Sequence, residues 1–215
     1  MNIDSRHFDK NSVRRAIAVM LCVIVNVALS RMIYYYEIPL YLDTIGTITA
    51  SALGGLLPGI MTAVLTNILC SFYNSYSLYY TMISLAVAIC SAYFWGNEKY
   101  KKKGLTAAFV MGLGLISGLL GTAIQWILFR DTQFENVSSM SEKLTDIMGI
   151  PYWGSVSLVN SGLNIIDKLI SVIAAMLIIT IVPQHIKRSI WISGWKQKPL
   201  SNSELQMLKK RGEEK

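Results

Sequence analysis

The sequence predicts an all-α polytopic membrane protein with six transmembrane helices. Composition is the first observation behind this prediction: the 215 residues are 53% hydrophobic and only 15% charged, which is fewer charges than a soluble domain of this size normally carries. The sequence contains six apolar stretches, and six helices of about 20 residues each, the number that crosses about 30 Å of hydrocarbon, would use most of the chain. We therefore expect one helical membrane domain, residues 1–183, followed by a basic tail, residues 184–215.

The placement of Lys and Arg is the second observation, and it predicts the topology. Of the 20 basic residues, four precede the first apolar stretch, four lie between the fourth and the fifth, and eight follow the sixth. Cytoplasmic loops keep positive charge during insertion, so both termini and the loop 99–103 should be cytoplasmic in a multi-pass protein of the cell membrane. The net charge is +7, but the basic residues flank apolar segments and form no groove lined with aromatic residues. The expected partner is therefore the lipid bilayer and not nucleic acid.

The apolar stretches can be placed in order along the chain. The first has the charge order of a signal peptide, but no small-residue cleavage site follows it, so it is interpreted as a retained span. The second is rich in Gly, Ala, Ser and Thr, which lets helices approach closely. The tripeptide Leu57-Pro58-Gly59 should reverse the chain after it. The expected spans are residues 16–36, 40–57, 59–72, 81–95, 105–129 and 161–182.

Two further features concern the second half of the chain. Gly114 and Gly118 have the four-residue spacing of close helix packing, which serves contacts within one chain as readily as a dimer. Between the fifth and sixth spans lies an outer loop of about 30 residues, a length that is usually functional or disordered.

The strongest group of polar residues lies in the sixth span, with Lys168 beside it. Polar and charged groups inside a membrane helix are costly and tend to face the bundle interior or a wet cavity. We therefore predict a substrate site here, although Asp167 and Lys168 could instead be hydrated, or pair with Arg31 or Asp43 as a structural lock. Spacings of four, three and four place the following residues on one helical face: Asn160, Asn164, Asp167 and Ser171.

Other candidates are expected at the same depth on the outer side. Aromatic walls with a few convergent polar groups are typical of small-molecule pockets. Asp43 could instead have a structural role, because the helix dipole stabilises a negative charge near the N-terminus of the second span. Each Trp could instead be an interfacial anchor. The additional predicted substrate-binding residues are Gln125, Trp126, Trp153, Asp43 and Asn67.

No catalytic residue, metal site or cofactor is predicted, and we expect a protein that is not an enzyme. His7 and His185 flank spans, and the sequence contains no HExxH, GxSxG or P-loop motif. Cys22, Cys70 and Cys90 lie in apolar runs without CxxC spacing and are interpreted as buried thiols. The absence of a detectable inverted repeat makes a secondary transporter the weaker interpretation.

Five stretches resemble the substrate-binding S components of energy-coupling factor (ECF) transporters: PLYLDTIGT at 39–47, ALGG at 52–55, PG at 58–59, LTN at 65–67 and NIIDKLIS at 164–171. The resemblance covers about residues 13–183 and is moderately specific. It implies capture of a vitamin or similar micronutrient from outside, followed by docking onto a transmembrane coupling subunit and a pair of ATPases. The family often docks through Ala-x-x-x-Ala on its first helix, where this chain has Ala16, Ala18 and Cys22 without that spacing.

The membrane domain is also similar to the N-terminal sensory region of some bacterial signalling proteins, in which a phosphatase or kinase follows on the cytoplasmic side. The tail 195–215 resembles a linker to such a downstream domain, and its Ser201-x-x-Glu204 matches a capping box at the start of a short helix. Capture of a small molecule for uptake is the preferred function, and ligand sensing is the alternative. Both predict a pocket on the outer side.

Overall fold

The computed structural model describes residues 10–97, 99, 102–130, 132, 135–183 and 186–187, and within them the chain is helical without strands. The predicted all-α class is therefore confirmed. The sequence-predicted linker and capping box at 195–215 lie outside the described residues. The helices are α1 (Lys10–Tyr35), α2 (Ile45–Gly54), α3 (Leu56–Cys70), the 3-10 helix η1 (Ser75–Leu78), α4 (Thr81–Gly96), α5 (Lys103–Ile124), the π-helical turn η3 (Gln125–Phe129), α6 (Glu135–Met148) and α7 (Tyr152–Ile181).

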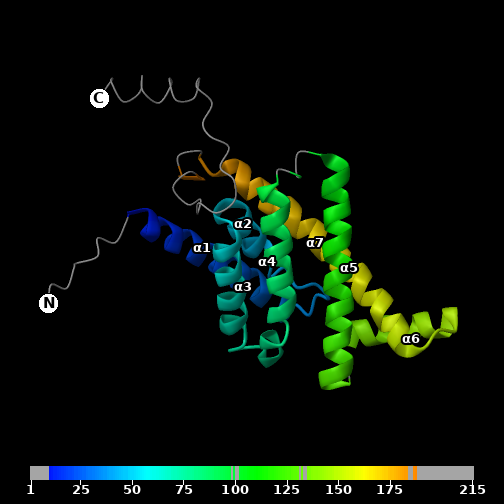
Figure 1. Ribbon diagram of the computed structural model, residues 1–215. Coiled ribbons are helices and arrows are strands. Elements are labelled where there is room, and N and C mark those ends of the chain that lie inside the picture. The colour runs from blue at the N-terminus through cyan, green and yellow to red at the C-terminus, as the bar shows by residue number, and fades with distance from the viewer. Residues whose placement is uncertain are drawn as a thin grey trace, which may run out of the picture.

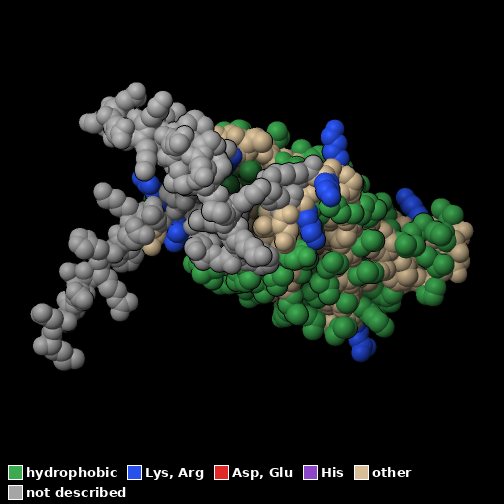
Figure 2. All heavy atoms as spheres, turned by 45° about the horizontal axis from the view of Figure 1, so that its top comes forward, with side chains coloured by type: hydrophobic (Ala, Val, Ile, Leu, Met, Phe, Trp, Pro, Cys, Tyr) green, Lys and Arg blue, Asp and Glu red, His purple; other side chains and the backbone are tan. Residues whose placement is uncertain are grey.

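Within the described residues, three segments are long and apolar enough to cross a membrane: Ser12–Tyr35, Lys103–Phe129 and Tyr152–Ile181. Hydrophobic side chains cover much of the surface in Figure 2. Ile17 and Leu21 of α1, for example, are both more than half exposed. An apolar surface of this extent is unfavourable in water and is solvated by lipid. The chain is therefore a membrane protein. The remaining apolar helices, α2, α3 and α4, are shorter, and the 10 residues of α2 rise only about 15 Å.

Helix α2 occupies the centre of the bundle. All of its residues are buried, and it contacts α1, α3, α4 and α7. Small residues allow this: a Cβ added at Gly46 would overlap the carbonyl oxygen of Cys22 in α1, and one added at Gly59 of α3 would overlap the Ser51 hydroxyl. The Gly and Ser content of the second predicted span therefore serves close packing on several sides.

The chain reverses at Gly55, not at Leu57-Pro58-Gly59 as the sequence suggested. Gly55 has φ 86°, a conformation that glycine adopts without steric cost. Pro58 lies in the first turn of α3, where the missing N–H costs no intrahelical hydrogen bond. Proline therefore begins the helix here and does not interrupt it.

Helices α5 and α7 cross and pack along one another (Figure 1). Cβ atoms added at Gly114 and Gly118 would overlap Ile165 and Ser161 of α7. The glycine pair therefore makes an intramolecular contact, in which the absence of side chains brings the two backbones together.

The expected outer loop at 130–160 contains a helix. It holds α6, which packs on α7 and projects from the side of the bundle in Figure 1. Gly149 ends α6 with φ 65°, and Pro151 precedes the first residue of α7, so that α7 starts at Tyr152 and not at Ser161. The Thr145 hydroxyl donates to Ser155 Oγ at 2.8 Å and holds α6 against α7.

Replacing Gly118 with alanine is expected to lower the free energy of unfolding by about 1–3 kcal/mol, because the added methyl group overpacks the α5–α7 contact. Gly112 is the matched control in the same helix, since nothing lies within 4 Å of a Cβ added there. Gly112→Ala should leave stability unchanged or raise it slightly. Denaturant unfolding in detergent, followed by circular dichroism, measures both; equal stability of the two variants would contradict this packing.

Candidate functional site

A non-helical segment, residues 36–44, connects α1 to α2 within the bundle, and Asp167 of α7 holds it. Asp167 is 0% exposed. Its Oδ1 accepts hydrogen bonds from the backbone N–H groups of Tyr41 at 3.1 Å and Leu42 at 2.8 Å. Leu42 has φ 44°, a left-handed conformation that persists in a non-glycine residue only when its surroundings hold it. Asp167 therefore fixes the path of the chain into α2.

Lys168 completes this arrangement. Its Nζ donates to Asp167 Oδ2 at 2.6 Å and to Thr44 Oγ1 at 3.1 Å, and the side chain is only 2% exposed. The interpretation of Asp167 and Lys168 as hydrated surface groups is therefore wrong. They do form a structural lock, but with each other and the backbone; Arg31 instead lies over the ring of Tyr73, 4.8 Å from its centroid.

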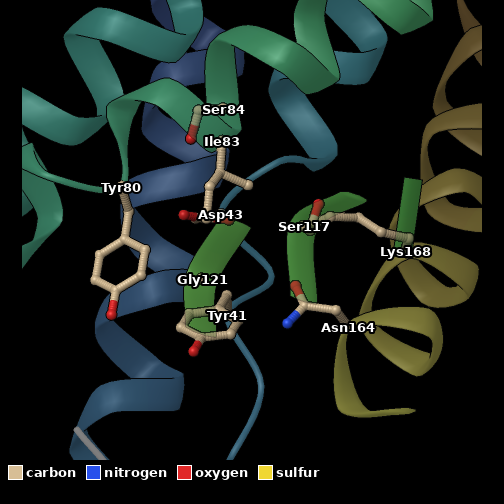
Figure 3. A pocket seen from close by; sticks show the side chains of 9 residues that line it. All are labelled: Tyr41, Asp43, Tyr80, Ile83, Ser84, Ser117, Gly121, Asn164 and Lys168. Atoms are coloured by element: carbon tan, nitrogen blue, oxygen red, sulfur yellow. The ribbon is translucent and has the colours of Figure 1, made fainter. Parts of the chain in front are cut away.

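Lys168, but not Asp167, borders a small space, which we name the lysine cavity (Figure 3). Its volume is about 20 Å³, room for roughly one water molecule. Segment 36–44, α4, α5 and α7 supply its walls, with Tyr80 at the start of α4. The polar residues that matter below are Tyr41, Asp43, Tyr80, Ser117, Asn164 and Lys168.

Two hydroxyls that line this cavity, those of Ser117 (1% exposed) and Tyr80, make no hydrogen bond of normal geometry in the described part of the chain. The side chain of Gln125 lies near enough to interact with the Tyr80 hydroxyl. Burial raises the pKa of Tyr80 to about 12, so its hydroxyl keeps the proton and can donate. Asn164 Nδ2 donates to the Asn160 carbonyl oxygen at 2.9 Å, which leaves the Asn164 Oδ1 as an acceptor. Buried polar atoms without partners are rare and mark the place of a water or polar ligand.

A second space, the tyrosine cavity, adjoins the first on the side of α1 and α3. Its volume is about 40 Å³. It shares Tyr41, Asp43 and Tyr80 with the lysine cavity, and the Tyr41 and Tyr80 ring centroids are 6.2 Å apart. The lining residues used below are Tyr34, Tyr41, Asp43, Asn67, Asn74 and Tyr80. Asp43 therefore lies between the two cavities.

Asp43 is not the hydrogen-bonding cap of α2. That role belongs to Asn26 of α1, whose Oδ1 accepts from the backbone N–H of Gly46 at 2.6 Å. Asn26 Nδ2 also donates to the hydroxyls of Thr47 and Thr66, both at 3.1 Å, and so joins α1, α2 and α3. The signal for Asn26 was present in the sequence, because it is a lone amide inside an apolar span.

The structure divides the remaining predicted site residues between the cavities and the α5–α7 contact. Asn67 lines the tyrosine cavity and donates to Ser84 Oγ at 2.9 Å. Asn160 donates to Thr122 Oγ1 and Gln125 Oε1, both at 3.0 Å. These last bonds join α7 to α5 and its π-helical turn, so Asn160 and Gln125 hold the wall behind the site.

Trp126 and Trp153 lie elsewhere, on an open groove at the surface. Their ring centroids are 6.4 Å apart, and together with Ile127 and Arg130 they line about 530 Å³. Trp126 is 58% exposed, as expected for an interfacial aromatic residue. The residues predicted to form one site therefore lie in two separate places, the buried cavities and a surface groove.

The predicted docking residues lie on α1. Ala16 is exposed, whereas Ala18 and Cys22 are partly buried, and the Cys22 carbonyl faces Gly46 of α2. Only the first therefore presents a freely accessible side chain.

Comparison of the chain with protein-family models, characterised proteins and solved structures found no match.

Replacing Asp167 with alanine is expected to destabilise the protein by about 3–5 kcal/mol, because it leaves the Lys168 ammonium buried without a counter-charge. Adding Lys168→Met should recover part of this loss, since the unpaired charge is then removed. Thermal unfolding in detergent compares the single and double variants. Glu142→Ala on the exposed face of α6 is the control and should have no effect; a double variant no more stable than Asp167→Ala would contradict the pairing.

Proposed function

We propose that this protein captures a small molecule from the outer side of the cell membrane for ECF-type uptake, as a substrate-binding S component. The observation that supports this proposal best is the lysine cavity, where the Ser117 hydroxyl is buried without a partner among the described residues. Ser51, Ser91 and Ser171 also have unpaired hydroxyls in that part of the chain but line neither cavity, so the position of Ser117 beside an open volume is what supports a ligand. A polar ligand that enters the cavity supplies the missing hydrogen bonds.

We further propose that the chain crosses the membrane six times with both termini in the cytoplasm. Lys99, Lys102 and Lys103 lie where α4 connects to α5, at the end of the bundle opposite η1 (Figure 1). The tyrosine cavity is lined by Ser77 of η1 and by Tyr80 at the start of α4, so the cavities lie toward the η1 end. Positive charge retained inside then places the cavities outside. The short helix α2 and segment 36–44 together make one crossing.

A non-helical stretch at membrane depth is tolerated only where protein covers it and satisfies its backbone. Asp167 does this for the N–H groups of Tyr41 and Leu42. Interrupted helices of this kind commonly border the substrate sites of membrane transporters. The arrangement therefore supports a ligand site at segment 36–44.

The cavities in the described conformation have the volume of a few water molecules. Tyr41 and Tyr80 belong to the walls of both, so displacement of their rings would merge the two spaces. Capture in this proposal begins with that displacement at the η1 end. Release inside is driven by the coupling subunit and its ATPases.

Ser117→Ala is expected to weaken ligand binding about tenfold, the value of one hydrogen bond of roughly 1.4 kcal/mol, without reducing stability. The fold should be unaffected because the hydroxyl has no partner in the described residues. Native mass spectrometry of the purified protein, with identification of the molecule released on denaturation, measures occupancy in each variant.

Ser91→Ala is the matched control for this experiment. Like Ser117 of α5, Ser91 of α4 is a buried serine whose hydroxyl has no partner among the described residues, but it lines neither cavity. Its variant should keep full occupancy. Wild-type protein that retains nothing and binds nothing from a panel of vitamins and metabolites would refute the proposed function.

Ala16→Phe is expected to abolish co-purification with an ECF coupling subunit and its ATPases, because the bulky ring blocks close approach to α1. Ala16 is exposed, so the fold should tolerate the ring. Ala28→Phe, at an exposed position near the opposite end of α1, is the control and should co-purify normally. Undiminished co-purification of Ala16→Phe would exclude this part of α1 as the docking face.

A further inference from the structure

The charges around the two cavities do not balance. Asp43, Asp167 and Lys168 contribute two carboxylates and one ammonium. The Lys168 ammonium lies 2.6 Å from Asp167 Oδ2, and the described residues contain no cationic side chain within 4 Å of the Asp43 carboxylate. Asp43 therefore has no direct ion-pair partner in the described residues, and the Lys168 ammonium attracts it only from another wall of the lysine cavity. A partly buried carboxylate in this position is costly unless a positive group accompanies it.

The tyrosine cavity has the chemistry to hold that positive group. Its lining contains one carboxylate, Asp43, and no Lys, Arg or His. Lys168 borders the lysine cavity only, and the Arg31 guanidinium is placed over the ring of Tyr73. The space beside Asp43 is thus free of competing cations on the side of α1 and α3.

Aromatic rings complete the surroundings of Asp43. Tyr34, Tyr41 and Tyr80 come from α1, segment 36–44 and the start of α4, and all three line the tyrosine cavity. The face of an aromatic ring carries partial negative charge and attracts ammonium groups, and several rings around one site are a recurring solution for binding quaternary ammonium ligands. The Tyr80 hydroxyl, which makes no hydrogen bond of normal geometry in the described chain, adds a polar contact.

The small volume limits the size of the occupant. About 40 Å³ on one side of Asp43 and about 20 Å³ on the other hold only a few water molecules, so even a compact head group enters only after Tyr41 and Tyr80 move, and a large ring system needs a larger displacement. The lysine cavity, with the Lys168 ammonium and the Ser117 hydroxyl, suits a hydroxyl or another hydrogen-bonding group attached to that head.

We infer that the ligand of this site is a small organic cation, held by Asp43 and the rings of Tyr34, Tyr41 and Tyr80. This inference rests on the proposed function and deepens it by naming the substrate class. A positive head group occupies the tyrosine cavity and replaces the missing counter-ion of Asp43. Its polar substituent extends into the lysine cavity.

Choline and its uncharged carbon isostere, 3,3-dimethylbutan-1-ol, are suitable probes because they differ in charge while their shapes match. Isothermal titration of the full-length protein in detergent, at constant ionic strength set with sodium chloride, should show choline binding at least about tenfold more tightly than the isostere. Methylammonium, tested in parallel, covers the case of a smaller head group. Equal binding of choline and the isostere, or no binding of either cation, would overturn the inference.

Two variants test the residues. Asp43→Asn should reduce cation affinity at least about tenfold and leave the binding of the isostere unchanged. Glu142→Gln, which removes an exposed carboxylate of α6, is the matched control and should bind as the wild type does. Cation affinity retained in Asp43→Asn would contradict the assignment.

A third variant keeps the test informative if Asp43→Asn proves unstable. Tyr34 is half exposed at the end of α1, so Tyr34→Leu should leave the fold intact and still weaken choline binding severalfold. Native mass spectrometry separates failure of this inference from failure of the proposed function. Retention of an anionic or neutral metabolite would refute the cation class and leave capture standing, whereas an empty protein that binds no probe would refute both.

Discussion

The contact between Asp167 and the backbone of Tyr41 and Leu42 is the constraint on which the rest of the site depends. A chain inside the membrane must satisfy its own backbone groups, and a helix is the usual way to do so. Asp167 provides another way for segment 36–44, and Lys168 balances its charge. Helix α2 can then be short, and the space that a longer helix would fill becomes available to Tyr41, Asp43 and the two cavities.

The site divides its charged groups between two tasks. Asp167 and Lys168 satisfy one another and the chain around them, so their removal is a matter of stability. Asp43 lies nearby and has no direct ion-pair partner in the described residues. The Ser117 and Tyr80 hydroxyls likewise make no hydrogen bond of normal geometry there. A protein that leaves these groups unpaired in a membrane bears a cost that a bound ligand offsets.

The sequence was sufficient for the helices whose apolar runs end at charges, turns or glycine, and for polar residues that are exceptional inside such runs, among them Asp43, Asn164 and Lys168. It was insufficient where the type of a residue does not indicate its conformation or its partners in the fold. Tyr41 and Leu42 are apolar and read as part of a span, yet they are not helical, because the group that holds them is 125 residues or more away along the chain. Helix α6 was missed because its apolar residues cover only one face of a surface helix. Serine and tyrosine are ordinary in membrane segments, so Ser117 and Tyr80 acquire meaning only from the partners they lack.

The amide of Asn26 has a consequence for how the chain enters the membrane. It lies in the middle of α1, and its hydrogen-bond partners are Gly46, Thr47 and Thr66, which are synthesised later. Until they arrive, α1 holds a polar side chain against lipid, while α2 is too short and too rich in Thr, Ser and Gly to be a stable span alone. Both costs are removed when the α2–α3 hairpin packs on α1, because Asn26 then makes its hydrogen bonds and α2 is covered by protein. In the proposed six-span topology, the first three helices therefore insert as a single unit.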